Sequence, residues 1–208
     1  MLLSRIRPLP NATFRLWKRP SSSSCIVPTV SYASLQNKEE LSTTIGAAFG
    51  ANGMGLLAVG GLPQLDTLRT ALLPLAYEFG NLKKDIQEKY ALEEAYYSFG
   101  WSRGKEKFQG RPDFSKGSYY NNPQYNTPVF DKNLIEEYPA FLHPNIWPNE
   151  VPAMEEAFMT LGQHMVEVGL LVAYQCDQYI QKQCHTYTNG LLYQLIQESL
   201  CCKARYEA

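Results

Sequence analysis

The sequence predicts a helix-dominated α+β fold, with one long central helix and a few short strands. Apolar side chains recur at three- and four-residue steps over residues 151–182, which indicates a single long helix. The β-branched segment 26–31 and the apolar run 55–59 have the composition and length of short strands. Apolar residues make up 45% of the chain and charged residues 19%, which is typical of a globular protein rather than a disordered one.

Further helices are expected at 38–50, 64–79 and 188–199, where apolar residues again follow a helical period. Residues 81–95 have a polar composition and predict a solvated helical extension. The periodic pattern is lost from residue 96 to residue 130. Ten aromatic side chains in this last segment nevertheless predict ordered packing rather than a disordered loop.

Residues 1–24 have the composition of an organelle transit peptide, because they are rich in arginine and serine and contain no acidic residue. We expect mitochondrial import; plastid import and a basic tail on a cytoplasmic protein are the alternatives. Residues 25–208 then form the folded domain. No segment approaches the roughly 20 consecutive apolar residues that span a bilayer, so no membrane span is expected.

The charge of the body excludes one class of partner. Residues 1–24 hold five of the 19 basic side chains, which leaves 14 basic against 20 acidic side chains in the rest. A mildly acidic domain lacks the positive charge that a phosphate backbone requires, so no nucleic acid is expected as a partner. The five cysteines are odd in number and lack paired metal-ligand spacing, which favours reduced thiols and no metal site.

Several segments occur in an order that resembles the N-terminal region of the isopenicillin N synthase-like dioxygenases. The most specific of them is Asn-x-Trp-Pro at 145–148, which leads into the predicted long helix. The resemblance covers about residues 26–205. The other matching segments are PTVSY at 28–32, AFG at 48–50, GLLAV at 55–59, KGSYY at 116–120, Pro152, Phe158, Leu161 and KAR at 203–205.

The resemblance implies an iron held by two histidines and a carboxylate on a double-stranded β-helix barrel, with an arginine of that barrel binding 2-oxoglutarate. None of His143, His164 and His185 begins the His-x-Asp or His-x-Glu pair that the family uses. The chain is therefore expected to be a truncated, pre-barrel part of such an oxidoreductase. The two short strands would then lack the sheet that they join in the family.

No cofactor is expected for this chain, and no catalysis by it alone. For a full-length form, the resemblance implies Fe(II), 2-oxoglutarate and the oxidation of a small organic substrate. Two alternatives remain open at this point. The chain could be a non-enzymatic helical interaction module that binds a protein partner, or an unrelated helical protein.

The resemblance also implies that residues 99–122 line a substrate pocket. Hydrogen-bond donors and positive charge in this segment would suit a small molecule with a carboxylate. The alternative is a packed surface loop with ordinary aromatic anchors. The candidate substrate-binding residues are Ser102, Arg103, Lys105, Tyr119, Tyr120 and Asn121.

Overall fold

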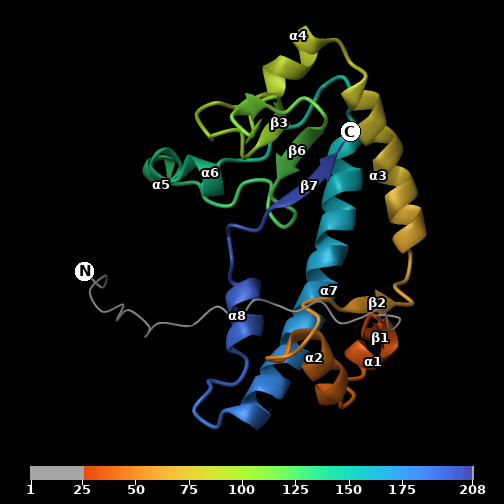
Figure 1. The fold of residues 1–208 in the computed structure, drawn as a ribbon. Helices are drawn as coiled ribbons and strands as arrows, with labels where there is room; N and C mark the ends of the chain where they lie inside the picture. Colours follow the sequence, from red (N-terminus) through yellow and green to blue (C-terminus); the bar gives the residue numbers. More distant parts are fainter. Residues whose placement is uncertain (1–25, 208) are drawn as a thin grey trace.

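The computed structural model describes residues 26–207, and the central element of this part is helix α7, Met154–Gln183 (Figure 1). Its bounds confirm the long helix predicted over 151–182. The predicted transit peptide at 1–24 lies outside the described residues. Among the described helices, none is both long enough and apolar enough to cross a membrane.

Four helices pack along α7 and cover part of its apolar surface. Helix α3 contains Pro74 and closely follows the predicted range of 64–79. Helices α2 and α8 are shorter than the periodic patterns that predict them. The four are α1 (Tyr32–Gln36), α2 (Ser42–Phe49), α3 (Leu65–Gly80) and α8 (Leu191–Gln197).

The two predicted strands pair with each other. Strand β1, Thr29–Ser31, runs parallel to strand β2, Ala58–Gly60, with Val30 opposite Val59. Val30 is buried, so the pair contributes to the core beside α1. The expectation that these strands lack a sheet partner is therefore wrong, because β1 and β2 pair with each other.

The polar helix expected over 81–95 is wrong for most of its length. Only α4, Lys84–Gln87, and the 3₁₀ turn η1, Glu88–Tyr90, are helical. The buried Gln87 side chain donates from Nε2 to Phe79 O at 3.1 Å and to Gly80 O at 2.8 Å. These two hydrogen bonds satisfy backbone carbonyls at the end of α3. They also turn the chain back toward α3, so no continuous helix forms over 81–95.

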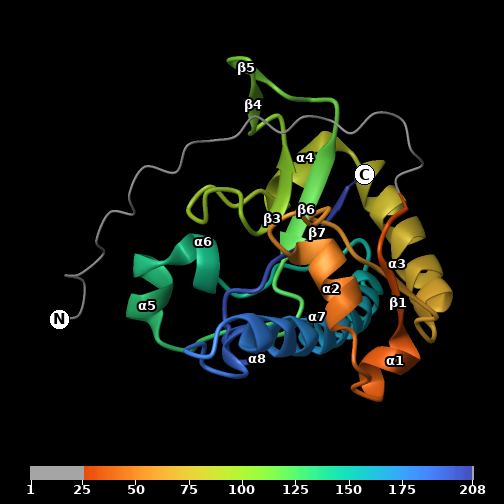
Figure 2. The ribbon, with the colours of Figure 1, turned by 60° about the horizontal axis from the view of Figure 1, so that its bottom comes forward.

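The segment 96–130 is ordered, as its aromatic content predicts, and supplies most of a three-stranded antiparallel sheet. Its strands are β3 (Gly100–Arg103), β6 (Gly117–Asn121) and β7 (Ala204–Glu207), in the order β3-β6-β7. A small hairpin of β4, Lys107–Phe108, and β5, Arg111–Pro112, projects beyond this sheet (Figure 2). Two short helices, α5 (Lys132–Glu137) and α6 (Pro139–Leu142), come after β6 and before α7 in the chain.

An aromatic core joins the sheet to α3 and α7. Phe79 of α3 meets the rings of Trp101 and Tyr119 edge-on, with centroids 5.2 and 5.0 Å apart. Tyr119 stacks on Tyr206 of β7 at 5.5 Å, and Phe158 of α7 contacts Tyr206 from the other side at 6.3 Å. Edge-to-face and offset pairs of this kind add to the free energy that burial alone supplies.

The turn from α7 into α8 depends on one buried acid, Asp177. Its carboxylate accepts hydrogen bonds from the backbone N–H groups of Leu192 and Tyr193, both at 2.9 Å, and from the Tyr187 hydroxyl. These donors belong to the first turn of α8 and the loop before it. A side chain of α7 therefore caps the helix that follows it.

Replacing Asp177 with Ala should lower the free energy of unfolding by about 3 kcal/mol, because buried donors to a charged acceptor are left unsatisfied. Chemical denaturation measures the change. The matched control is Asp131→Ala, which removes an exposed cap of α5 that accepts from Asn133 N at 2.9 Å. That control should cost about 1 kcal/mol. Equal losses in the two variants would contradict the role of Asp177.

Candidate functional site

The three-stranded sheet has one apolar and one polar face, because successive side chains of a strand point to opposite sides. Trp101 and Tyr119 lie opposite each other on β3 and β6 and are buried in the aromatic core. Ser102, Ser118 and Glu207 occupy the alternate positions, as do Tyr120 and Arg205. The polar face is therefore exposed to a ligand along most of the sheet.

A cleft of about 240 Å³ lies over this polar face. It brings together three of the predicted substrate-binding residues, Ser102, Lys105 and Tyr120. The sequence analysis missed the other lining residues, which are Tyr96, Tyr97, Ser98, Glu106 and Lys203. Tyr96 and Tyr97 both have positive φ, 53° and 56°. Two consecutive non-glycine residues in this conformation store backbone strain beside the cleft.

Two lysines give the cleft positive charge. Lys105 Nζ lies 3.1 Å from a carboxylate oxygen of Glu88 and 5.0 Å from the ring centroid of Tyr97. The hydrogen bond to Glu88 raises the pKa of Lys105. This cation is therefore already neutralised in part by a neighbouring acid.

Lys203 differs from Lys105 because its ammonium group meets no carboxylate among residues 26–207. Its Nζ donates to Ser98 O at 2.7 Å and Ala140 O at 3.0 Å, and lies 3.3 Å from the ring centroid of Phe99. Burial of the ammonium group lowers the pKa of Lys203 to about 8, although the residue as a whole is exposed. The group remains a cation at neutral pH.

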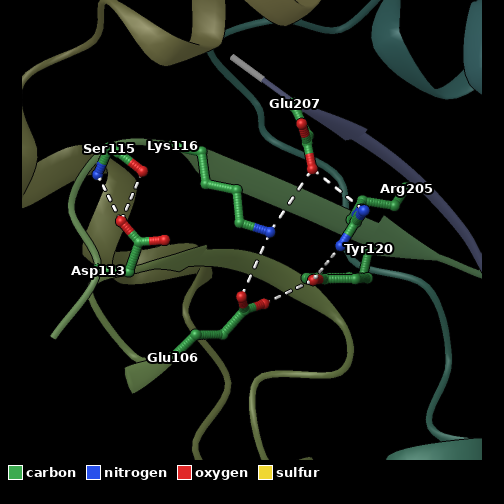
Figure 3. Close-up of polar contacts among 7 residues, drawn as sticks. All are labelled: Glu106, Asp113, Ser115, Lys116, Tyr120, Arg205 and Glu207. Carbon is green, nitrogen blue, oxygen red and sulfur yellow. Dashed lines mark hydrogen bonds and ion pairs between the residues drawn. The ribbon is translucent and has the colours of Figure 1, made fainter. Parts of the chain in front are cut away.

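A closed ring of polar contacts holds the floor of the cleft (Figure 3). The Tyr120 hydroxyl donates to Glu106 at 2.9 Å, and Lys116 lies 3.3 Å from Glu106 and 3.6 Å from Glu207. Arg205 completes the ring with 3.1 Å to Glu207 and 3.4 Å to the Tyr120 hydroxyl. The hydrogen bond from Tyr120 is the main reason that the pKa of Glu106 is lowered. Exposed pairs of this kind add little stability, so the ring mainly orients its members.

The structure places Tyr119 and Asn121 away from the cleft, on the buried face of β6. The Tyr119 hydroxyl donates to Ile146 O at 3.0 Å. Asn121 donates to the same oxygen at 2.8 Å and accepts from Ile146 N at 3.2 Å. Their polar groups are thus satisfied by the segment that precedes α7. Arg103, the sixth predicted residue, lies on the opposite side of β3 from Ser102 and lines a separate pocket.

The described residues do not fit an iron site. Within residues 26–207 there is no group of three histidine, cysteine, aspartate or glutamate side chains that could hold a metal ion. The ring of His143 lies beside Phe99, with centroids 5.7 Å apart, and His164 lies within α7 beside Tyr32. His185 follows α7 in an exposed turn. The three histidines thus lie in different surroundings.

Comparison with known proteins shows that this chain is similar in fold to a solved structure. No protein family model matches the chain, and no curated protein matches it. A crystal structure of a protein from Caulobacter crescentus, assigned to the 2OG-Fe(II) oxygenase family, matches with a TM-score of 0.59 and 19% identity. The match covers 74% of this chain and 48% of that one, so the matched part spans about half the length of the oxygenase.

The buried ammonium of Lys203 predicts a pH effect on stability. Its pKa is about 8 in the folded chain and about 10.4 when unfolded. Between these values the unfolded state binds more protons, so the contribution of Lys203 to stability rises with pH. The free energy of unfolding of the native chain, minus that of Lys203→Met, should therefore increase from pH 7.5 to pH 9.5. Denaturation midpoints measure it, with Lys132→Met on α5 as control. A difference that is constant with pH for Lys203→Met would contradict the prediction.

Proposed function

We propose that this chain is the N-terminal, substrate-facing part of a non-haem Fe(II), 2-oxoglutarate-dependent oxygenase. The observation that carries the proposal is the fold likeness to the Caulobacter protein assigned to that family, which extends over three quarters of the chain. The polar face of the sheet β3-β6-β7 supports it, because this face carries both the cleft and its cations. The same likeness does not favour a non-enzymatic helical interaction module.

In this proposal the iron ligands and the 2-oxoglutarate-binding arginine belong to a barrel outside the described residues. The apolar side of α7 supports the proposal that such a barrel packs against this chain. Two hollows lie along this side, one of about 380 Å³ lined by Leu161 and Met165 and one of about 400 Å³ lined by Val172, Cys176 and Ile180. These five residues follow one stripe of the helix, and Met165 is 53% exposed. A second sheet packed there would cover the stripe.

The substrate class follows from the cleft over the polar face. Lys203 contributes a cation without a carboxylate partner among the described residues, while Lys105 is paired with Glu88 and Glu106 with Lys116. The cleft therefore has a small positive charge, aromatic walls and room for a small molecule. We propose a small organic substrate with a single carboxylate, oriented by Lys105 and Lys203 beside the ring of Tyr120.

Cellular location is part of the proposal. The arginine- and serine-rich composition of residues 1–24 supports import into mitochondria. The acidic balance of the rest of the chain supports a small molecule rather than a nucleic acid as the ligand.

In this proposal the polar cleft faces the substrate, and the apolar side of α7 faces the barrel.

Butyrate, as a small carboxylate probe, should bind the 208-residue chain in the cleft. Nuclear magnetic resonance titration measures the affinity. Lys105→Met should weaken binding by about tenfold, since one charge-assisted contact is removed. Lys107→Met is the matched control, because Lys107 is an exposed lysine of the adjacent strand β4 and does not line the cleft. Equal effects of the two substitutions would indicate general charge attraction and contradict the proposed site.

A further inference from the structure

A second polar pocket lies on the other side of the β3–β6 hairpin, where the hairpin meets the end of α3. Its volume is about 310 Å³, which is the size of a site for a small ligand. Tyr77 and Asn81 line it from the α3 side, and Arg103, Phe114 and Lys116 line it from the hairpin. None of these five residues lines the cleft described above.

Aromatic rings give this pocket flat walls. Tyr77 is 73% exposed and Phe114 is 62% exposed, so both rings have apolar surface that a ligand could cover. The Phe114 ring lies directly against Gly104, where an added Cβ would be 2.1 Å from the ring. Glycine at this position, with φ of +70°, thus lets the backbone approach the ring and fixes one wall.

Arg103 provides the free charge of the pocket. Among residues 26–207 it forms no ion pair, whereas Lys116 lies between the carboxylates of Glu106 and Glu207 at 3.3 and 3.6 Å. Lys116 is therefore neutralised by its neighbours. The pocket offers about one net positive charge, on a guanidinium whose two parallel donors match a carboxylate.

We infer that this pocket is a second ligand site, which binds a small aromatic monocarboxylate. The carboxylate would pair with Arg103, and the ring would lie between Tyr77 and Phe114. A single unpaired cation suits one negative charge better than the two of a phosphate monoester. The exposed aromatic walls suit a planar apolar body, because burying them against a ring removes apolar surface from water.

The pocket lies apart from the cleft, because strand alternation directs Arg103 and Ser102 to opposite sides of β3. Lys116 is nevertheless shared with the contact ring that holds Tyr120 and Glu106 beside the cleft (Figure 3). A ligand that drew Lys116 toward the pocket would thus compete with Glu106 for it. The first question is whether the pocket binds at all, and it can be answered without iron or 2-oxoglutarate.

Benzoate titrated into the 208-residue chain, followed by isothermal calorimetry, tests the inference. Benzoate is also a small carboxylate of the kind proposed for the cleft, so the titration is repeated on Lys105→Met, which weakens the cleft. In that variant benzoate should bind the pocket as one site, and benzamide, its neutral counterpart, should bind at least tenfold more weakly. Arg103→Gln should weaken benzoate binding by at least tenfold, because the paired cation is lost. The matched control is Arg111→Gln, which removes an exposed arginine of the neighbouring β4–β5 hairpin, outside the pocket, and should leave the affinity unchanged.

Two further variants, one in the pocket and one in the cleft, test where benzoate binds. Tyr77→Ala removes an exposed wall that the fold does not need, and should also weaken benzoate binding. Lys105→Met weakens only the cleft and should leave the affinity of the pocket for benzoate unchanged. The inference is overturned if benzoate does not saturate, or if Arg103→Gln and Arg111→Gln lower the affinity equally. It is also overturned if Lys105→Met abolishes binding while Arg103→Gln does not. Unchanged thermal melting of each variant verifies that the fold is intact.

Discussion

The packing of the three-stranded sheet against α3 and α7 depends on one contact, the stacking of Tyr119 on Tyr206. Phe79 and Phe158 pack against this pair of rings. These four rings come from β6, β7, α3 and α7, so a single cluster joins segments that are far apart in the chain. Because it buries one face of the sheet, the cluster turns Ser102, Tyr120 and Arg205 outward. The position of the polar cleft is thus a consequence of aromatic packing on the opposite face.

The Asn-x-Trp-Pro segment before α7 has a structural role in this arrangement. Asn145 accepts from Asn122 N at 2.7 Å and donates to Asn122 O at 2.8 Å, and Trp147 donates to Asn126 at 3.0 Å. Asn121 holds Ile146 from the end of β6. Buried amides that satisfy both donors and acceptors in this way fix one geometry. The segment therefore sets the position of the sheet relative to the start of α7.

The parts of the fold that could be predicted from the sequence are those with a local signal. Helices α3 and α7 each carry a long apolar stripe, and both were predicted to within a few residues. Strand β7 has no such signal, because only its pairing with β6, more than 80 residues earlier, makes it a strand. Residues 81–95 have good helical composition, but the side chain of Gln87 turns back to the end of α3 and stops the helix.

The candidate site was predicted in part for the same reason. The sequence marked Ser102, Lys105 and Tyr120, which do share the cleft, but it could not separate them from Arg103, Tyr119 and Asn121. Strand alternation would separate these residues once β3 and β6 were known, and neither strand was predicted. Lys203 was missed because it reaches the cleft from the far end of the chain, so that no local pattern connects it with Lys105.

The measurement that tests the central claim most directly is iron-dependent release of succinate from 2-oxoglutarate by the purified 208-residue chain. In the proposed function this chain supplies the substrate-facing sheet, and the metal ligands belong to a barrel outside the described residues. We therefore expect no release above the background of free iron, with or without small carboxylate substrates. Succinate release that requires the chain, Fe(II) and 2-oxoglutarate together would contradict the account, because the chain would then hold a working metal centre.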